Sequence, residues 1–263
     1  MVNTIQTPLF VPASRPDRFA KAAASGAAAV ILDREAAVAP EDQAEARAAL
    51  TSGFTDRPVI LRINAAGTPW HADDTEAARH LAPGAVMLPK AEDPAAVART
   101  AEALGGIPVI ALVESAAGLA FARDIAALDG VCRLAFGSVD FCAELNCAHK
   151  REVLLPARFE LVLASRLAGI PAPLDGVTTQ LDDPGAVFSD AAHARDLGMS
   201  GKLCIHPRQI PHAARAFVPT EEEIAWAQRV MAAGEGASAA GGEMIDAPVR
   251  ARARAVLARR QSR

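Results

Sequence analysis

The chain has 263 residues and a formal net charge of −4, with 51% hydrophobic and 22% charged residues. This length fits one large α/β domain with a well-filled core. The negative charge, the absence of tyrosine and the 4% aromatic content argue against a nucleic-acid-binding surface. No apolar run approaches the ~20 residues that cross a bilayer, so we expect no membrane association.

Short apolar runs recur along the chain and predict eight β-strands. The runs are almost continuously apolar, as is typical of parallel strands covered on both faces by helices. The predicted strands are Thr7–Val11, Ala28–Asp33, Val59–Asn64, Ala85–Lys90, Pro108–Glu114, Arg133–Asp140, Asp175–Thr179 and Lys202–His206.

A helical segment follows each predicted strand. The predicted helices are Pro16–Ser25, Pro40–Thr51, a helix from near Asp73, Asp93–Leu104, Ala116–Leu128, Pro156–Ala168, Asp183–Leu197 and Pro207–Phe217. Eight alternating βα units are what a closed parallel barrel needs. The sequence therefore predicts an α/β fold, a TIM (β/α)8 barrel, over residues 1–218.

Residues 219–263 are predicted to form a C-terminal helical extension. Thr220 and Glu223 have the spacing of a capping box that opens a helix through about Ala233. Gly234–Gly242 is rich in Gly, Ala and Ser and is expected to be a mobile loop, after which Met244–Arg259 returns to helix. Because this extension has no place inside a barrel, we expect it to pack on a neighbouring subunit.

Polar residues that can do chemistry stand at the ends of the predicted strands. Asp33 and Glu35 follow the second strand, Arg62 ends the third, and Lys90 ends the fourth. The carboxyl ends of barrel strands share one face, and that face holds the active sites of barrel enzymes. We expect these side chains to surround one pocket.

Glu114 and Asp140 end neighbouring strands, the fifth and the sixth. Two adjacent carboxylates in a pocket must be protonated, paired with a cation or bound to a metal. Mg²⁺ often takes only one or two protein carboxylates. A magnesium site at Glu114 and Asp140 is one interpretation, and the alternative is that each acid caps the helix that follows it.

Three cations and one histidine complete the candidate set. Arg62 can bind a carboxylate through two parallel hydrogen bonds, or it can pair with Glu35 or Asp33 across the barrel mouth. Lys90 and Arg15 add positive charge to the same face, with surface or structural ion pairs as their alternative. His206 is either a proton carrier or part of the barrel rim.

Motifs for several other activities are absent from the sequence. There is no GxSxG elbow, Walker loop, GxGxxG turn or HExxH helix, which leaves serine hydrolysis, nucleotide hydrolysis and zinc proteolysis without support. The four cysteines lack CxxC spacing and are expected to be reduced thiols. No signal segment opens the chain, so we expect a soluble, cytoplasmic protein.

Ordered fragments across the whole chain resemble the HpcH/HpaI aldolase and citrate lyase family, in particular its citrate lyase beta subunit-like members. The matching fragments are Leu9–Phe19, Ala29–Asp33, Arg62–Asn64, Gly67–Trp70, Met87–Lys90, Ala111–Ser115, Phe136–Asp140, Lys202–Pro207 and Gly242–Val249. Each fragment alone is weak evidence for the family, but the order of all of them along the chain is specific to it.

The resemblance implies a TIM barrel that binds Mg²⁺ through Glu114 and Asp140 and holds an oxo-acid with Arg62. Members make or break a carbon–carbon bond beside a thioester, or hydrolyse such thioesters. For such a reaction the candidate acid or base is Asp33, Glu35 or His206, and we expect Arg15, Lys90, Arg62 and Glu114 to take part in substrate binding. Homotrimers, or hexamers built from them, are common in the family.

Three departures from the family pattern are visible. The second strand usually finishes Asp-Leu-Glu-Asp, and here it reads Asp33-Arg34-Glu35-Ala36. One acid fewer and one cation more are expected to move the charge at the barrel mouth by about two units. Ala117 stands where the family carries an arginine, and Val139 replaces the glutamate before Asp140.

The sequence therefore predicts a Mg²⁺-dependent carbon–carbon lyase. Its substrate would be a 3-hydroxyacyl-CoA thioester of the citryl-CoA or malyl-CoA type, cleaved to acetyl-CoA and an oxo-acid. Two alternatives stay open: an acyl-CoA thioester hydrolase of the same family, and a catalytically impaired protein that binds an oxo-acid or acyl-CoA.

Overall fold

The structure is a computed structural model that describes residues 2–233, 238–240 and 243–261. Its main sheet has eight parallel strands in the order β1 to β8. The strands are β1 Pro8–Pro12, β2 Ala29–Asp33, β3 Val59–Arg62, β4 Ala85–Leu88, β5 Val109–Val113, β6 Val131–Phe136, β7 Leu174–Asp175 and β8 Gly201–Lys202.

Backbone contacts between the first and last strands close the sheet into a barrel. Leu9 and Cys204 form a parallel bridge. The amide of Phe10 donates to the Cys204 carbonyl at 2.9 Å, and the amide of Cys204 donates to the Pro8 carbonyl at 3.0 Å. The predicted TIM barrel is thereby confirmed.

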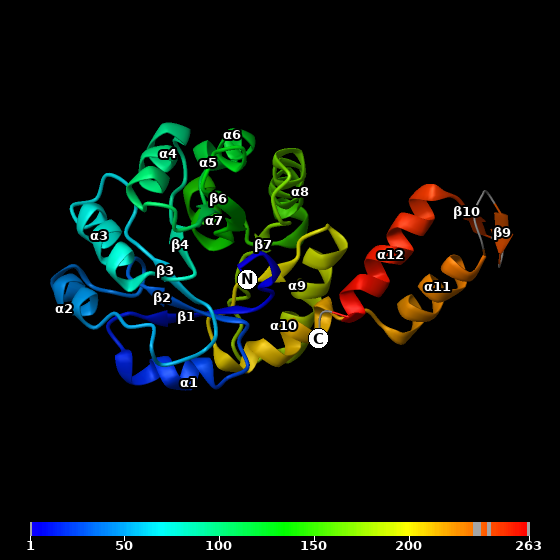
Figure 1. Ribbon diagram of the computed structural model, residues 1–263, viewed down its shortest axis with the longest axis horizontal. Helices are drawn as coiled ribbons and strands as arrows, with labels where there is room; N and C mark the ends of the chain where they lie inside the picture. Colours follow the sequence, from blue (N-terminus) through cyan, green and yellow to red (C-terminus); the bar gives the residue numbers. More distant parts are fainter. Residues whose placement is uncertain (1, 234–237, 241–242, 262–263) are drawn as a thin grey trace. The chain divides into compact units, whose positions relative to one another are not determined.

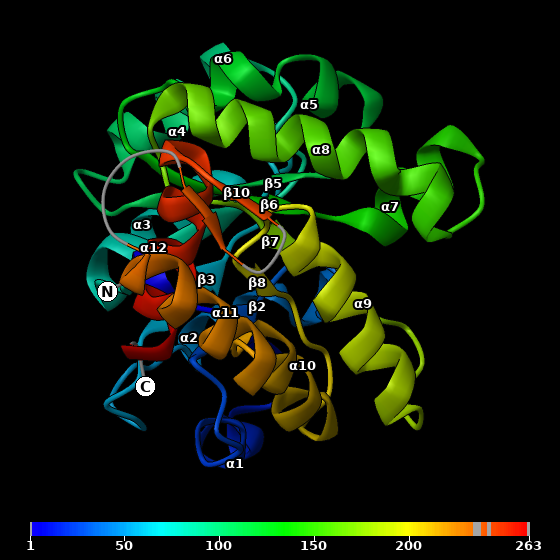
Figure 2. The same cartoon turned by 90° about the vertical axis from the view of Figure 1, so that its right-hand side faces the viewer.

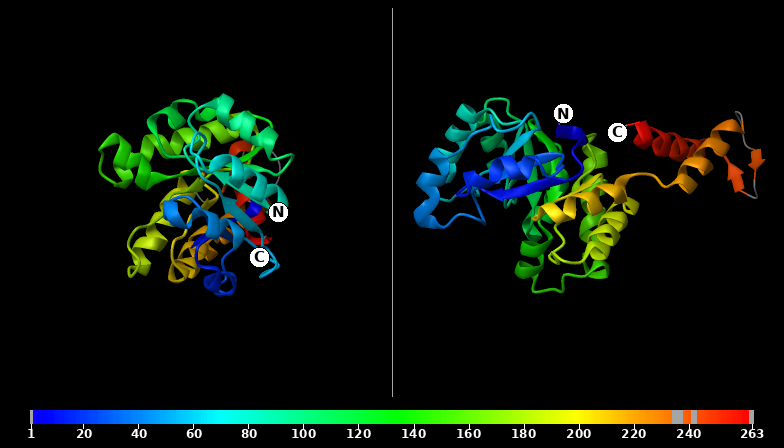
Figure 3. Two further views of the ribbon diagram at one scale, coloured as in Figure 1. Left: turned by 90° about the vertical axis from the view of Figure 1, so that its left-hand side faces the viewer. Right: turned by 90° about the horizontal axis from the view of Figure 1, so that it is seen from below.

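Helices lie outside the strands, as Figures 1 and 3 show. The helices of the barrel are α1 Phe19–Ala23, α2 Gln43–Ala48, α3 His71–Leu81, α4 Pro94–Ala103, α5 Ala116–Ala120, α6 Ala122–Ala126, α7 Ser138–Leu145, α8 Arg151–Ala168, α9 Pro184–Asp196 and α10 Ile210–Phe217. Short 3-10 helices cover Val2–Thr4, Pro16–Arg18, Pro40–Asp42 and Pro207–Gln209.

Several predicted boundaries were wrong. The sixth strand ends at Phe136 because the chain turns at Gly137 and begins helix α7, which the sequence analysis had treated as strand and loop. Strands β7 and β8 have only two residues each, since the segments after them leave the sheet to line the cavity described below. The expected helix over 116–128 is broken at Phe121 into two short helices.

Helix α8 also begins earlier than expected. Pro156 was predicted at its start, but the helix opens at Arg151 and carries Pro156 inside it. A proline inside a helix removes one intrahelical hydrogen bond. The helix runs on to Ala168 along the outside of β6 (Figure 2).

The barrel interior is filled by apolar side chains from the strands and from the segments beside them. Buried members of this cluster are Val2, Ile5, Ala29, Ile31, Ile60, Ala85, Met87, Ile110, Leu112, Ala135, Leu174 and Leu203. Such a packed interior is the normal core of this fold. It leaves the carboxyl ends of the strands as the place where a cavity can open.

A buried ionic cluster ties helix α8 to strands β7 and β8. Asp175 is fully buried and accepts hydrogen bonds from Arg158 Nε at 2.7 Å and Lys202 Nζ at 3.1 Å. Lys202 Nζ also donates to the Gly176 carbonyl at 2.6 Å. Burial opposes ionisation of Asp175, but the charges and hydrogen bonds of Lys202 and Arg158 outweigh it and lower its pKa.

The chain forms two compact units, Met1–Ala214 and Arg215–Arg263. The second contains α11 Glu221–Ala232 and α12 Ala247–Gln261, with a hairpin of β9 Ser238–Ala240 and β10 Glu243–Ile245. Its core is Ala227, Val230, Ile245, Ala253 and Val256.

The capping box that opens helix α11 is confirmed. The Glu223 amide donates to Thr220 Oγ1 at 3.1 Å, and the Thr220 amide donates to Glu223 Oε2 at 2.8 Å. Of the expected mobile loop Gly234–Gly242, residues 238–240 form β9, and 234–237 and 241–242 lie outside the described residues. Packing of this unit on a neighbouring subunit stays a prediction.

In the part of the chain that the structure describes, no helix has both the length and the apolar character needed to cross a bilayer.

Replacing Asp175 tests the ionic cluster. Asp175→Asn leaves Arg158 and Lys202 buried with a neutral partner, and removing one member of a buried ion pair costs about 3–5 kcal/mol. We expect the free energy of unfolding at pH 7 to fall by about 3 kcal/mol, measured by urea denaturation.

The difference between wild type and Asp175→Asn should depend on pH. Because the folded pKa of Asp175 is lowered, its contribution is present above the unfolded carboxyl value of about 4 and is lost as pH falls through the folded value. Asp182→Asn, in an exposed pair with Arg208, is the control and should cost about 0.5 kcal/mol or less. Equal effects of the two substitutions would contradict this assignment.

Candidate functional site

Strand alternation carries polar side chains from the apolar interior to the mouth of the barrel. Successive residues of a strand point to opposite faces, so positions two apart share a face. Asp33, Arg62 and Glu114 each stand two positions after a residue of the interior cluster, namely Ile31, Ile60 and Leu112. All three side chains are buried at the carboxyl ends of their strands.

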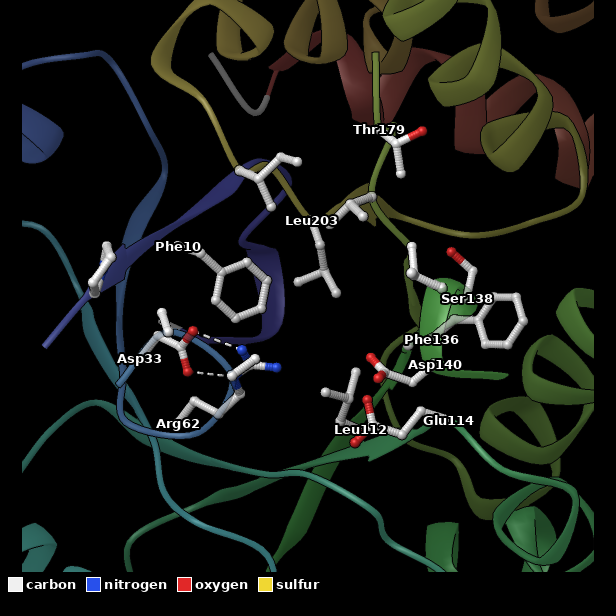
Figure 4. A pocket seen from close by; sticks show the side chains of 17 residues that line it. Phe10, Asp33, Arg62, Leu112, Glu114, Phe136, Ser138, Asp140, Thr179 and Leu203 are labelled. Atoms are coloured by element: carbon white, nitrogen blue, oxygen red, sulfur yellow. Dashed lines mark hydrogen bonds and ion pairs between the residues drawn. The ribbon is translucent and has the colours of Figure 1, made fainter. Parts of the chain in front are cut away.

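These residues line a cavity of about 410 Å³ at that end of the barrel (Figure 4). Its lining is mostly apolar, with the charged groups gathered in two places. The lining residues are Phe10, Pro12, Asp33, Ala36, Ala37, Arg62, Leu112, Glu114, Phe136, Gly137, Ser138, Val139, Asp140, Val177, Thr179, Leu203 and Ile205. The volume suits a small organic ligand.

Arg62 is held in a fixed orientation on one side of the cavity. Its Nε donates to Asp33 Oδ1 at 2.7 Å and its Nη2 donates to Asp33 Oδ2 at 2.6 Å, a bidentate pair. The guanidinium lies over the Phe10 ring, with 4.7 Å from Cζ to the ring centroid. Burial works against the charge of Arg62, but Asp33, Glu35 and Glu114 raise its pKa.

The ion pair that the sequence analysis held open as an alternative role for Arg62 is therefore present. One nitrogen, Nη1, is left over from the pair with Asp33 and points toward the cavity in Figure 4. It lies 3.2 Å from Glu35 Oε2, and Glu35 Oε1 in turn accepts a hydrogen bond from Lys90 Nζ at 2.9 Å. A substrate carboxylate that reached Arg62 would meet it through this nitrogen.

Glu114 lies across the cavity from the Arg62–Asp33 pair (Figure 4). Its Oε1 accepts a hydrogen bond from the backbone amide of Lys90 at 2.8 Å, and Lys90 itself has a left-handed backbone, φ 48°. Burial, with the charges of Glu35 and Asp140, raises the pKa of Glu114 to about 7 against the lowering by Lys90 and Arg62. A divalent cation beside it would favour the ionised form.

Asp140 stands in the first turn of helix α7, not at a strand end as predicted. The error comes from Gly137, where the strand stops and the helix begins. A side chain at Gly137 would overlap the carboxylate of Glu114, so glycine is needed for the two elements to approach. Asp140 still lines the same cavity as Glu114, at its exposed edge.

Neither carboxylate caps a helix, which removes the alternative interpretation of this pair. The side chain of Ser115 caps α5, and α7 begins after Gly137 without a side-chain cap. Within the described ranges, no hydrogen bond or ion pair reaches the Asp140 carboxylate, and Oε2 of Glu114 has no hydrogen-bond donor.

The charges around the cavity fit a divalent cation. Among the described residues around the cavity, the four carboxylates of Asp33, Glu35, Glu114 and Asp140 face the two cations Arg62 and Lys90, so two negative charges are unbalanced when all four are ionised. Carboxylate oxygens are the ligands that Mg²⁺ prefers, and one or two from the protein are sufficient. No group of three or more His, Cys, Asp or Glu side chains suited to a metal occurs among the described residues, so water and ligand oxygens would complete the shell.

Other candidate residues lie outside the cavity. Arg15 is exposed and pairs with Asp17 at 2.8 Å, the surface ion pair given as its alternative. His206 does not line the cavity; its Nδ1 accepts a hydrogen bond from the Arg208 amide at 3.1 Å and caps a 3-10 helix. Glu35 and Lys90 pair with each other and are not among the lining residues.

Arg34 does not add positive charge to the barrel mouth, contrary to expectation. Its position has the opposite parity to Asp33, so its side chain leaves the barrel on the outer face and is fully buried there. It pairs with Asp74 of α3 and donates to Gln43 Oε1 at 2.8 Å. Burial, with the nearby charge of Arg47, lowers its pKa to about 10.

The remaining departures remove charge from the cavity or its surroundings. Ala36 and Val139 line the cavity with apolar groups, and Ala117 is exposed in the first turn of α5. At the second strand the mouth therefore lacks the acid at Ala36 but gains no cation from Arg34, and Val139 removes a second acid of the family pattern from the cavity lining.

The sequence analysis missed Phe10, Leu112, Phe136 and Ser138 as parts of the site. Leu112 is detectable from its strand position, two residues before Glu114. Nothing in the local sequence marks Ser138, whose surroundings come from a loop and from β7.

Comparisons with known proteins agree with this geometry. The model of the HpcH/HpaI aldolase/citrate lyase family matches residues 6–207. A citrate lyase subunit beta-like protein of Mycobacterium tuberculosis is 40% identical over 262 residues, covering 95% of this chain and 94% of the relative. A (3S)-malyl-CoA thioesterase of Cereibacter sphaeroides is 30% identical over 252 residues, covering 90% and 88%.

The fold is also shared with a solved structure. Protein CitE from Mycobacterium tuberculosis, in complex with magnesium, acetoacetate and coenzyme A, superimposes with a TM-score of 0.89 at 39% identity. The match covers 98% of this chain and 99% of that chain.

Replacing Arg34 separates its packing role from the cavity. Arg34→Met removes the buried partner of Asp74, and we expect the free energy of unfolding to fall by about 3 kcal/mol in urea denaturation. Calorimetric Mg²⁺ affinity should change by less than about twofold, because the side chain lies on the other face of the strand. Arg57→Met, at an exposed position, is the control for loss of an arginine. A large change in Mg²⁺ affinity with stability intact would contradict this placement.

Proposed function

This chain belongs to the HpcH/HpaI aldolase/citrate lyase family, and from that premise we propose that it is a Mg²⁺-dependent carbon–carbon lyase. The substrate would be a 3-hydroxyacyl-CoA thioester of the malyl-CoA or citryl-CoA type. The observation that carries the proposal is the pair of carboxylates, Glu114 and Asp140, facing Arg62 across an apolar cavity.

Glu114 and Asp140 would hold the metal. Bound there, Mg²⁺ supplies Lewis-acid stabilisation to a hydroxyl that becomes an oxo group. Glu114 is already oriented by the Lys90 amide, so one of its oxygens remains for the ion. The solved relative with magnesium, acetoacetate and coenzyme A supports this combination of ligands.

Arg62 would bind the carboxylate of the oxo-acid end of the substrate. Asp33 takes two of its nitrogens and so fixes the plane of the guanidinium, while Nη1 is presented to the cavity. The ion pair of Glu35 with Lys90 gives Glu35 a second partner, so an incoming carboxylate can replace it at Nη1 without leaving it unpaired.

The apolar wall would exclude water from the breaking bond. Phe10, Leu112, Phe136, Val177 and Leu203 line the cavity between the two charged groups. Removing water strengthens the electrostatic contacts and protects an enolate from unwanted protonation. The bulk of coenzyme A would stay outside the cavity, with only the acyl end inside.

Neutralising each presumed ligand tests the metal site. Glu114→Gln and Asp140→Asn keep the side-chain size but remove a charge, and each should weaken Mg²⁺ binding at least about tenfold in titration calorimetry. Glu144→Gln, on the same helix as Asp140 and exposed, is the matched control and should bind as wild type does. Unchanged affinity in both site variants would remove the metal from this site.

The products formed from acyl-CoA thioesters test the reaction. With Mg²⁺ and malyl-CoA or citryl-CoA, we expect acetyl-CoA and an oxo-acid in equal amounts. Chromatography would measure acetyl-CoA, and an oxo-acid assay would measure the second product. Free CoA without an oxo-acid would instead indicate the thioester hydrolysis named in the Cereibacter relative. Binding without turnover of any thioester would indicate the impaired binding protein.

A further inference from the structure

The acyl end of the proposed substrate has one variable group. Carbon 3 of the thioester carries a hydroxyl, a carboxylate and a third substituent, called R below, which is hydrogen in malyl-CoA and carboxymethyl in citryl-CoA. After cleavage, R remains on the oxo-acid, bonded to the carbon next to the carboxylate. The surroundings of Arg62, which would bind that carboxylate, therefore determine which R fits the cavity.

Apolar groups lie next to Arg62 on the wall of the cavity. The Phe10 ring lies against the guanidinium, with 4.7 Å from Arg62 Cζ to the ring centroid. Pro12, at the end of the same strand, lines the cavity too, as do Ala36 and Ala37 in the segment after β2. A substituent bonded beside a carboxylate at Arg62 would contact this apolar surface.

The apolar lining is larger than a small oxo-acid can cover. Leu203 also lines the cavity, and Ile205, 41% exposed, extends the apolar lining to the mouth. The cavity of about 410 Å³ lies in the range that holds drug-sized ligands. Pyruvate would leave much of this surface facing water, whereas a longer alkyl R would cover it, and each buried methylene strengthens binding about fourfold.

A carboxylate on R would find no cation to pair with. Among the cavity-lining residues that the structure describes, Arg62 is the one cation, and its Nε and Nη2 already bind Asp33. Lys90 pairs with Glu35 and does not line the cavity. Asp33 and Glu35, which both contact Arg62, would instead repel a second negative charge on the oxo-acid.

The uncharged polar groups of the lining do not replace a cation. Ser138 is 1% exposed, and its Oγ is already hydrogen-bonded to His149 at 2.9 Å. Thr179 lies on the opposite side of the cavity from Arg62 in Figure 4. A carboxylate on R would therefore lose hydration without gaining a charged partner, a cost that an alkyl R does not have.

Ala36 is also a position at which this chain departs from the family pattern. The pattern has an acid there, and here a methyl group lines the cavity instead. The change removes a negative charge beside Glu35 and enlarges the apolar surface. It therefore favours an apolar R in this chain in particular.

We propose that R is an alkyl chain of two or more carbons, selected by the apolar surface of Phe10, Pro12 and Ala36. This inference rests on the proposed lyase function and names its substrate class. The substrate is a 3-hydroxyacyl-CoA thioester with one carboxylate and an alkyl tail on carbon 3, and the products are acetyl-CoA and a 2-oxo acid with that tail.

The cleavage of this substrate balances without a further reactant. The bond between carbons 2 and 3 breaks, and its electron pair stays on carbon 2, which takes up one proton to become the methyl group of acetyl-CoA. The hydroxyl on carbon 3 loses one proton and becomes the oxo group. No oxidant or reductant is needed, and R takes no part in the bond changes.

The affinities of 2-oxo acids test the proposal without requiring turnover. In titration calorimetry with saturating Mg²⁺, pyruvate, 2-oxobutanoate and 2-oxopentanoate differ by one methylene each, so the Kd should fall about fourfold at each step. 4-Methyl-2-oxopentanoate has nearly the shape of oxaloacetate, with two methyl groups in place of the carboxylate oxygens. It should bind at least about tenfold more tightly than oxaloacetate.

A substitution at Ala36 tests where the tail lies. Ala36→Asp restores the acid of the family pattern, and because the residue is exposed the fold should be unaffected. The advantage of 2-oxopentanoate over pyruvate should fall from about fifteenfold to about threefold or less. This ratio cancels the effect of the new charge on the shared carboxylate. Ala39→Asp, exposed and outside the cavity lining, is the control and should keep the wild-type ratio.

The outcomes separate the tail preference from the function on which it rests. Oxaloacetate binding as tightly as 4-methyl-2-oxopentanoate would overturn the proposal, as would a Kd that does not fall with tail length. A wild-type ratio in Ala36→Asp would overturn the place assigned to the tail. A preference for alkyl tails in calorimetry, combined with no thioester cleavage in the product assay, would support the binding preference and contradict the lyase.

Discussion

The site depends on negative charge that the protein leaves unbalanced at the mouth of the barrel. Glu114 is buried and Asp140 is close enough to raise its pKa, yet no cation of the described chain pairs with the Asp140 carboxylate. Buried like charges are costly unless a cation compensates them. On the opposite wall, Arg62 is already neutralised by Asp33 and Glu35. The unbalanced carboxylates therefore favour binding of a divalent cation, and the bound cation would then attract an anionic ligand.

The barrel makes this arrangement possible because each strand carries core residues first and a charged residue at its carboxyl end. The same inward face is apolar at Ile31 and Leu112 and polar two positions later, at Asp33 and Glu114. The interior cluster holds the strands in register, and the short strand ends present the charges. On the outer face of the sheet, the ionic cluster around Asp175 connects α8 to β7 and β8.

Much of this was predictable from the sequence, because it follows from hydrophobic runs and strand alternation. The eight strands and the gathering of Asp33, Arg62 and Glu114 at one end follow from those two rules. The same alternation places Arg34 on the outer face, so its position also follows from the sequence. The contact of Ser138 with His149 was beyond reach, because it joins a helix start to a loop whose course is set by tertiary packing.

A crystal of this protein grown with Mn²⁺ and an oxo-acid would test the central claim most directly, since anomalous scattering locates the ion without assumption. We predict one strong peak in the cavity, about 2.1 Å from a carboxylate oxygen of Glu114 and of Asp140. The oxo-acid should contact both the ion and Arg62. An ion bound elsewhere, or an oxo-acid held with no ion between it and the two carboxylates, would contradict the account.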